Sequence, residues 1–135
     1  MANAPLKGGT MDPPARIVIV EDESITALHL ATQLRRLGYQ VVAQASSGPQ
    51  AIQQALSLHP HVVLMDIHLH GPMDGVDAAR HIQDAAPIPI VYMSAQADAA
   101  TIERLQATTQ AGGFVPKPIH LPTLYATLQR VCSRP

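Results

Sequence analysis

Short apolar runs alternate with segments of helical periodicity along most of this chain of 135 residues. The clearest run, Ile17–Val20, consists of β-branched residues, as in a strand that is buried on both faces. Comparable runs predict further strands at 41–43, 62–65, 88–93 and 114–115. Five strands that are each followed by a helix indicate one α/β domain, with a parallel sheet flanked by five helices on its two faces. Right-handed crossovers then favour the doubly wound strand order 2-1-3-4-5.

The predicted helices each carry apolar residues at helical spacing. These residues are Ile25, Leu28, Leu34 and Leu37; Ile52, Ala55 and Leu56; Val76, Ala79 and Ile82; Ile102 and Leu105; and Leu121, Leu124, Leu128 and Val131. We expect the first helix to end at Gly38 and the second, over 48–58, to end at His59-Pro60. The pair Gly112-Gly113 is expected to cap the fourth helix.

Composition narrows the class of protein. Hydrophobic residues make up 47% of the chain, which favours a folded core over disorder. The net charge is −1 and there is no basic stripe, so nucleic-acid binding has no electrostatic support. Cys132 is the only cysteine, which leaves no intrachain disulfide and no cysteine metal site. No membrane-spanning run or signal peptide is recognisable, and we expect a soluble cytoplasmic protein. Residues 1–15, rich in Gly and Pro, should form a flexible lead-in to a domain at 16–132.

Four short polar motifs each follow one of the apolar runs. They are Glu21-Asp22, Asp66, Ser94-Ala95 and Lys117-Pro118. In a parallel sheet these positions lie at one edge, and the order 2-1-3-4-5 places the first and third strands side by side there. The edge would then hold three carboxylates, a hydroxyl and an ammonium.

Such a set suits a divalent cation and a phosphoryl group. At about 5 Å, and with an effective dielectric near 20, each pair of carboxylates repels by roughly 3 kcal/mol, which a cation relieves. Mg²⁺ prefers oxygen ligands, whereas zinc would favour histidine or cysteine. A phosphoryl group on Asp66 would have one oxygen neutralised by the cation, one by Lys117 and one hydrogen-bonded by Ser94.

The motifs, taken in order, resemble the receiver domain of bacterial two-component response regulators over residues 16–131. This family has a flavodoxin-like fold. The segments that carry the resemblance are Ile17-Val18-Ile19-Val20-Glu21-Asp22-Glu23, Leu64-Met65-Asp66-Ile67, Met73-Asp74-Gly75, Met93-Ser94-Ala95 and Phe114-Val115-Pro116-Lys117-Pro118.

The resemblance implies that Asp66 accepts a phosphoryl group from the phosphohistidine of a sensor histidine kinase or phosphotransfer protein. Mg²⁺, or Mn²⁺, would be held by Glu21, Asp22 and Asp66, with the backbone carbonyl of His68 as a further ligand. His68 and Gln96 would tune how fast the phosphate hydrolyses. A signalling module of this kind is not expected to turn over a diffusible substrate.

The resemblance also assigns the groups around the phosphoryl oxygens. Lys117, the Ser94 hydroxyl and the backbone of Ala95 would stabilise them, and Ser94 and Phe114 would form a switch pair. The Lys117-Pro118 bond would be cis. The fourth helix, fifth strand and fifth helix would form the output surface for an effector or a homodimer, with candidates Gln106, Thr108, Thr109 and Tyr125. No output domain follows the last helix, so we expect a stand-alone receiver or a fragment of a longer regulator or hybrid kinase.

Two features depart from the common family pattern. The interval from Asp66 to Asp74-Gly75 is one residue longer, with His70-Gly71-Pro72 in place of the usual proline turn; a receiver subgroup with Asp-Ile-x-Leu-x-Gly-x-x-Asp-Gly is similar. The first acidic position holds Glu21 where many members hold aspartate.

Other interpretations compete with phosphate acceptance. A receiver-like scaffold would need no phosphate, and failure to bind Mg²⁺ would favour it. A phosphatase with an aspartate nucleophile would carry a second aspartate where this chain has His68. Neither GxGxxG nor GxxxxGK[ST] occurs, and no HExxH spacing supports a histidine metal site. The acids at 21–23 could simply cap the first helix, and Phe114 could be a plain core residue.

Overall fold

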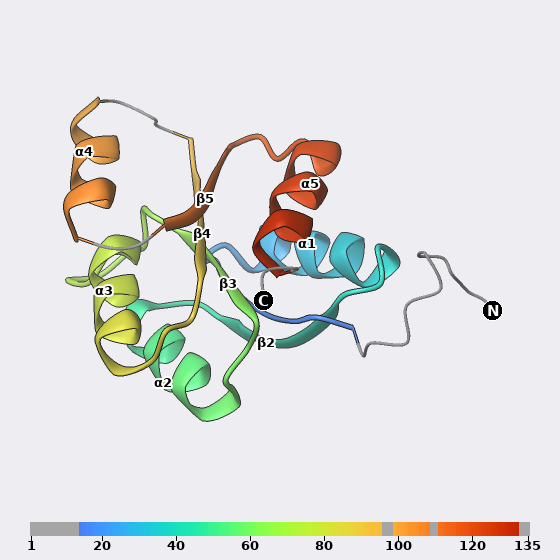
Figure 1. Cartoon of the computed structure of the whole chain (residues 1–135), viewed down its shortest axis with the longest axis horizontal. Coiled ribbons are helices and arrows are strands. Elements are labelled where there is room, and N and C mark those ends of the chain that lie inside the picture. The colour runs from blue at the N-terminus through green and yellow to red at the C-terminus, as the bar shows by residue number, and fades with distance from the viewer. Residues whose placement is uncertain (1–13, 96–98, 109–110, 133–135) are drawn as a thin grey trace.

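The computed structural model describes residues 14–95, 99–108 and 111–132. Its five strands form one parallel sheet in the order β2-β1-β3-β4-β5 (Figure 1). The strands are β1 (Arg16–Val20), β2 (Gln40–Ala45), β3 (Val62–Asp66), β4 (Ile90–Ser94) and β5 (Ala111–Pro116). The helices are α1 (Ser24–Arg36), α2 (Gly48–Leu58), α3 (Gly75–Ala85), α4 (Ala99–Thr108) and α5 (Leu121–Cys132). The predicted fold and strand order are confirmed.

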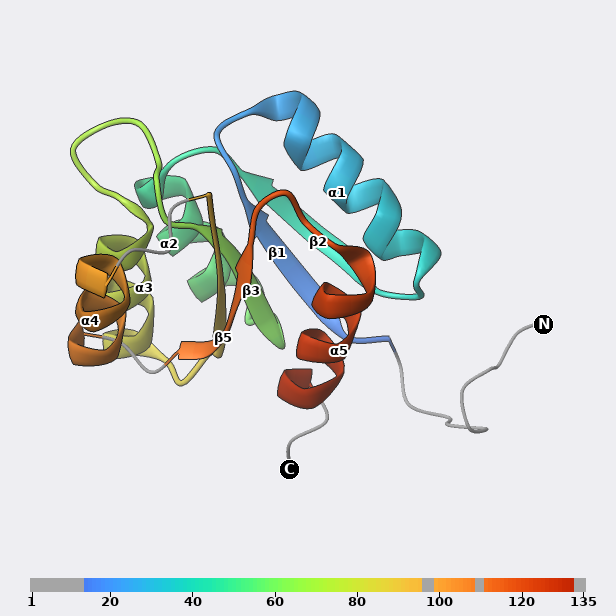
Figure 2. The same ribbon diagram turned by 90° about the horizontal axis from the view of Figure 1, so that it is seen from above.

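Helices cover both faces of the sheet. α1 and α5 pack on one face and α2, α3 and α4 on the other (Figure 2). Alternate residues of β1 serve the two cores, since Ile17 and Ile19 face α1 and α5 while Val18 and Val20 face α2 and α3. Burial on both faces explains why β1, β3 and β4 are almost continuous apolar runs in the sequence.

The buried stripe of α1 differs from the predicted one. Ile25 is 83% exposed and Leu28 is 58% exposed, and Leu37 lies beyond the helix and is also exposed. Of the four predicted residues only Leu34 is buried, and it shares the buried stripe with Ala27, Leu30 and Ala31. The prediction gave weight to large apolar side chains, whereas two alanines allow the helix to pack close to the sheet.

Gly112-Gly113 does not cap α4, contrary to the prediction. Both glycines lie within β5, which is longer than predicted and pairs with β4. A Cβ atom on Gly113 would lie 2.6 Å from Cγ2 of Thr127 in α5, and one on Gly112 would lie 3.2 Å from the carbonyl oxygen of Ile90. These glycines therefore allow α5 and β4 to approach β5 closely.

Other element ends are close to their predicted places. Gly38 has φ +97° and His59 has φ +48°, so left-handed residues follow α1 and α2 as expected. β4 begins two residues later than predicted, because the Ile88 N–H donates to the carbonyl of Ala86 (2.8 Å) in a turn and Pro89 has no N–H.

Residues 1–13 of the predicted lead-in lie outside the described residues. Within the described part, the helices are too short or too polar to cross a membrane.

Candidate functional site

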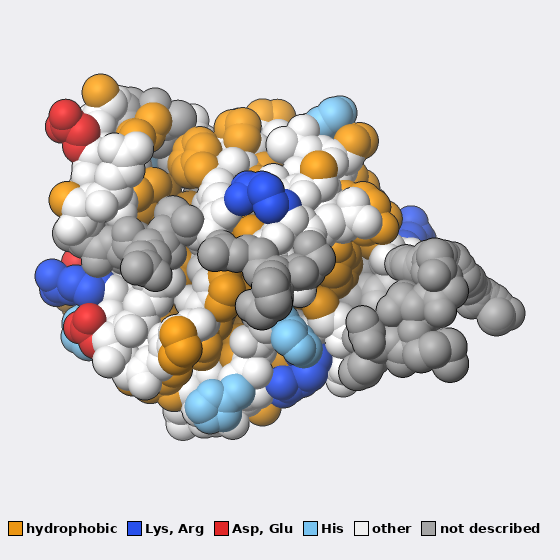
Figure 3. Space-filling model, in the orientation of Figure 1, with side chains coloured by type: hydrophobic (Ala, Val, Ile, Leu, Met, Phe, Trp, Pro, Cys, Tyr) orange, Lys and Arg blue, Asp and Glu red, His pale blue; other side chains and the backbone are white. Residues whose placement is uncertain are grey.

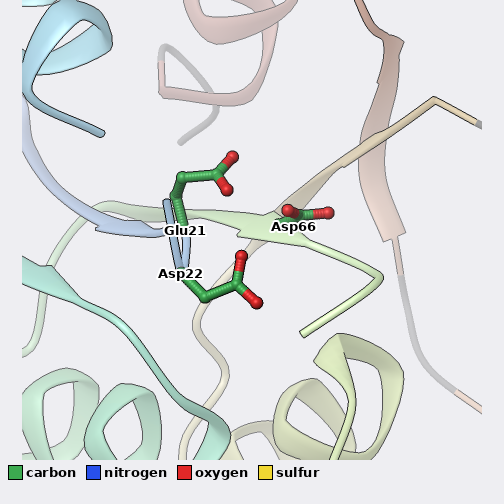
Figure 4. A group of neighbouring side chains, drawn as sticks. All are labelled: Glu21, Asp22 and Asp66. Atoms are coloured by element: carbon green, nitrogen blue, oxygen red, sulfur yellow. The ribbon is translucent and has the colours of Figure 1, made fainter. Parts of the chain in front are cut away.

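The predicted polar motifs meet at the carboxyl edge of the sheet. Glu21 and Asp22 follow β1, and Asp66 is the last residue of β3. β1 and β3 are neighbours with Val20 beside Met65, which places Asp66 next to Glu21. Figure 4 shows the three carboxylates converging from these two strands.

The three carboxylates are close enough to share one cation. One ligand oxygen from each of Glu21, Asp22 and Asp66 lies within 4.8 Å of the others. Glu21 is only 2% exposed and Asp66 only 5% exposed, so water screens their repulsion weakly. An all-oxygen donor set at this spacing fits a hard divalent cation such as Mg²⁺ or Mn²⁺.

Lys117 links two of these carboxylates. Its Nζ donates to Oε1 of Glu21 at 2.7 Å and to Oδ2 of Asp66 at 3.0 Å. Its backbone N–H donates to the carbonyl of Ser94 at 2.9 Å, and the following bond to Pro118 is cis, as predicted. The ammonium thus lies beside Asp66 because both its backbone and its side chain are fixed.

The surroundings shift the pKa values of Lys117 and Glu21. Burial lowers the pKa of Lys117, but the hydrogen bonds and charges of Glu21 and Asp66 outweigh it, so the net shift is upward. Burial, with the charge of Asp66, raises the pKa of Glu21 above its ordinary value despite the bond from Lys117. The site therefore keeps an ammonium and has more negative charge than Lys117 alone neutralises.

The loop after β3 is anchored directly to the acidic site. The backbone N–H of His70 donates to Oδ2 of Asp22 at 2.9 Å, and Nδ1 of the same residue contacts this oxygen. Burial raises the pKa of Asp22, but these contacts with His70 outweigh it and the net shift is downward. The backbone N–H of His68 donates to Oδ1 of Asp66 at 3.1 Å.

The longer interval to Asp74-Gly75 is accommodated by a closed loop. Gly71 has φ +101°, a conformation that favours glycine. The Gly75 N–H then returns to the carbonyl of Ile67 at 2.8 Å. A Cβ atom on Gly75 would lie 2.1 Å from the carbonyl oxygen of Asp66, so α3 begins in direct contact with the end of β3.

Ser94 and Phe114 lie at different depths. Ser94 is the last residue of β4 and is fully buried, and Ala95 follows it with an exposed side chain. Phe114 is half-buried, is paired with Tyr92 in the sheet, and packs against the core on the α2–α3 face. A half-buried ring in core contact is compatible with both the switch and the plain core interpretation.

The remaining predicted residues are the proposed dephosphorylation residues and those of the expected output surface. His68 has an exposed side chain, and Gln96 lies outside the described residues. On the expected output surface, Gln106 is exposed, while the Tyr125 ring packs edge-on against Tyr39 with ring centroids 6.2 Å apart. The side chain of Thr108 and all of Thr109 lie outside the described part.

Helix capping does not account for the acids after β1. Glu23 occupies the N-cap of α1, but its side chain makes no capping hydrogen bond. Instead the Glu23 N–H donates to Oε2 of Glu21 at 3.2 Å.

Sequence reasoning missed two participants. His70 was predicted only as part of a turn, and Arg104 of α4 was not singled out, although it binds Asp74 and Asp77 at the start of α3. The Asp74-x-x-Asp77 spacing is that of a capping box, which is a sequence signal for the start of α3. No sequence signal pairs Arg104 with acids about thirty residues away.

Comparison with known proteins agrees with the fold and the site. The sequence model of the family described as "Response regulator receiver domain" matches residues 17–129. The transcriptional regulatory protein PdtaR of Mycobacterium tuberculosis is 32% identical over 121 residues, covering 90% of this chain and 58% of that protein. A protein-glutamate methylesterase/protein-glutamine glutaminase of Archaeoglobus fulgidus is 33% identical over 104 residues, covering 76% of this chain and 30% of that protein.

A solved structure shows the same relationship. The signal receiver domain of a modulated diguanylate cyclase from Desulfovibrio desulfuricans G20 superposes with a TM-score of 0.81 at 30% identity, covering 88% of this chain and 94% of that one. The chain spans little more than half the length of PdtaR and under a third of the methylesterase. The match therefore concerns one domain of these relatives. The chain belongs to the receiver domain family of two-component response regulators.

Proposed function

We propose that this receiver domain accepts a phosphoryl group on Asp66, in a Mg²⁺-dependent reaction, from the phosphohistidine of a sensor histidine kinase or phosphotransfer protein. The observation that carries the proposal is the position of Lys117 Nζ, 3.0 Å from Oδ2 of Asp66, inside a cluster of three carboxylates. An ammonium in that position can neutralise an oxygen of an attached phosphoryl group.

The reaction follows from the groups at the site. A carboxylate oxygen of Asp66 attacks phosphorus, the phosphorus–nitrogen bond of the donor breaks, and its electron pair stays on the imidazole nitrogen. Lys117, the Ser94 hydroxyl and the Ala95 backbone N–H stabilise the phosphoryl oxygens. Bound Mg²⁺ would supply further charge neutralisation, held by Glu21, Asp22, Asp66 and the carbonyl of His68.

Signal output requires two conformations of the domain. In our proposal Ser94 moves toward the phosphoryl group, Phe114 turns inward, and the population shifts toward a form that binds an effector or a second copy. The surface of α4, β5 and α5 changes with it, including Gln106 and Tyr125. In the same proposal, His68 and Gln96 set the lifetime of the phosphoryl group.

Intact-protein mass spectrometry tests phosphate acceptance. Wild type is incubated with Mg²⁺ and acetyl phosphate, beside Asp66→Asn and the matched control Asp84→Asn, which changes an exposed acid of α3. We expect one added phosphoryl group in wild type and in the control, and none in Asp66→Asn or after chelation of Mg²⁺. Equal addition to Asp66→Asn would contradict the proposal.

A further inference from the structure

Arg104 of α4 forms hydrogen bonds with two acids at the start of α3. Nη1 and Nη2 of Arg104 donate to the two carboxylate oxygens of Asp74, at 2.6 and 3.1 Å. Nη2 also donates to Oδ1 of Asp77 at 3.0 Å. A guanidinium that binds a carboxylate with two parallel hydrogen bonds fixes its orientation as well as its charge.

Arg104 and Leu105 attach α4 to the rest of the domain in different ways: Arg104 binds the start of α3, and Leu105 packs into the core on the α2–α3 face. Of its described side chains only Leu105 is buried, and Ile102 is exposed. Figure 3 shows acidic and basic side chains next to each other at the edge of the molecule formed by α3 and α4. The Arg104 contacts are thus side-chain hydrogen bonds that join α4 to the start of α3.

Asp74 in turn fixes the first turn of α3. The Asp77 N–H donates to Oδ1 of Asp74 at 2.9 Å, and the Asp74 N–H donates to Oδ2 of Asp77 at 3.3 Å, which completes a capping box. Arg104 binds both acids of this capping box, so a residue of α4 stabilises the N-terminus of α3.

The first turn of α3 lies against the backbone of Asp66. Gly75 follows Asp74 directly, donates to Ile67, and has no room for a side chain beside the Asp66 carbonyl. The loop between Ile67 and Gly75 contains the His68 carbonyl proposed as a metal ligand. A displacement of the α3 terminus would therefore move the backbone on which this site depends.

We infer that Arg104 is a positioning residue for the phosphate-accepting site. By holding Asp74 and Asp77, it keeps the start of α3 against Asp66, and it ties α4 to the end of the loop that follows β3. Arg104 touches no reacting atom and acts through Asp74 and Gly75. The inference rests on the proposed function of Asp66.

Binding of beryllium fluoride, a phosphoryl mimic, tests the inference in the presence of Mg²⁺. We expect Arg104→Gln to bind it roughly fivefold more weakly than wild type, with an intermediate affinity for Arg104→Lys, which keeps the charge but not the paired hydrogen bonds. Arg80→Gln removes an exposed charge from α3 and should match wild type. Equal affinity in Arg104→Gln and wild type would overturn the inference.

Amide hydrogen exchange gives a readout that is independent of phosphate. Exchange at the Gly75 N–H should be faster in Arg104→Gln than in Arg80→Gln, while core amides of β1 stay protected in both. Unchanged exchange at Gly75 would overturn the positioning role. If wild type itself fails to bind beryllium fluoride, the proposed function is contradicted, and with it the role of Arg104 at a phosphate-accepting site. Faster exchange at Gly75 would then show only that Arg104 holds the start of α3.

Discussion

Lys117 affects both processes proposed for this site, which are binding of a divalent cation and stabilisation of a phosphoryl group. Its ammonium partly neutralises Glu21 and Asp66, and therefore competes with a divalent cation for the same carboxylates. The same charge would assist a phosphoryl group on Asp66. The two effects have opposite signs, so one substitution can separate them.

Lys117→Gln should bind Mg²⁺ at least as tightly as wild type, because three carboxylates then face the cation without a competing ammonium. Its phosphorylation by acetyl phosphate should be slower by about 100-fold, since one preorganised charge at the phosphoryl oxygens is lost. Calorimetric titration and a phosphorylation time course measure the two effects. Weaker Mg²⁺ binding with an unchanged rate would contradict this role.

His68 and Gln96 provide a second test at this scale. Substituting both residues by alanine should change the lifetime of phosphorylated Asp66, because the proposed function gives these two residues the role of tuning its hydrolysis. Loss of the label from purified phosphoprotein measures the lifetime. His81→Ala, which changes an exposed histidine of α3, is the control, and the idea fails if the double variant decays at the wild-type rate.

The core of the site was predictable residue by residue. Each of Glu21, Asp22, Asp66 and Lys117 lies at the end of, or just after, a recognisable strand, and parallel strands bring such positions to one edge. The contact between His70 and Asp22 was not predictable, because it depends on the path of the loop after β3, which local sequence pattern does not determine.

At the scale of elements, the contact of α3 with β3 leaves no space at Gly75. Gly75→Ala should lower the free energy of unfolding by about 1–3 kcal/mol, because the new methyl group meets the Asp66 backbone. It should also slow phosphorylation. Gly48→Ala is a useful comparison, since its Cβ would meet the flexible side chain of Met73 and should cost less. Chemical denaturation measures both, and equal stability of Gly75→Ala and wild type would rule out the close contact.

The link between α3 and α4 has a predictable pH dependence. Burial raises the pKa of Asp74, but Arg104 and Asp77 outweigh it, so the folded-state pKa lies below the ordinary value of 3.8. A lowered carboxyl pKa stabilises the fold above the unfolded-state value, and this stabilisation is lost as the pH falls through the folded-state value.

Arg104→Gln should therefore be less stable than wild type at neutral pH, by about 1 kcal/mol for a partly exposed ion pair. The difference should shrink as the pH falls from 3.8 toward the lower folded-state pKa, at which Asp74 of the folded protein becomes protonated. Denaturation curves across this range measure the difference. A gap that stays constant, or one that grows in acid, would show that Asp74 is not the partner that matters.

Element identity was easier to predict than element packing. The periodicity of α1 predicted a helix correctly, but Ile25 and Leu28 drew attention to the wrong face. Gly112-Gly113 resembles a helix stop, yet the pair serves the close packing of α5 on β5. In both cases small residues allow a neighbouring element to pack closely, and local sequence does not show which element that is.

At the scale of the whole molecule, one sheet separates two cores and ends in one polar edge. The α1–α5 core and the α2–α3–α4 core both stabilise β1 and β3, which hold the carboxylates. Burial of these strands on two faces fixes their register, and therefore the distance between Glu21 and Asp66. The fold thus brings like charges together, and a bound divalent cation would relieve the repulsion between them.

The central claim is that Asp66 itself carries the phosphoryl group, and one measurement tests it most directly. Borohydride reduces an aspartyl phosphate to homoserine, so reduction of the phosphorylated protein followed by peptide mass spectrometry locates the modified residue. We predict homoserine at position 66 and at no other aspartate. Homoserine at position 22, 74 or 77, with aspartate retained at 66, would contradict the account.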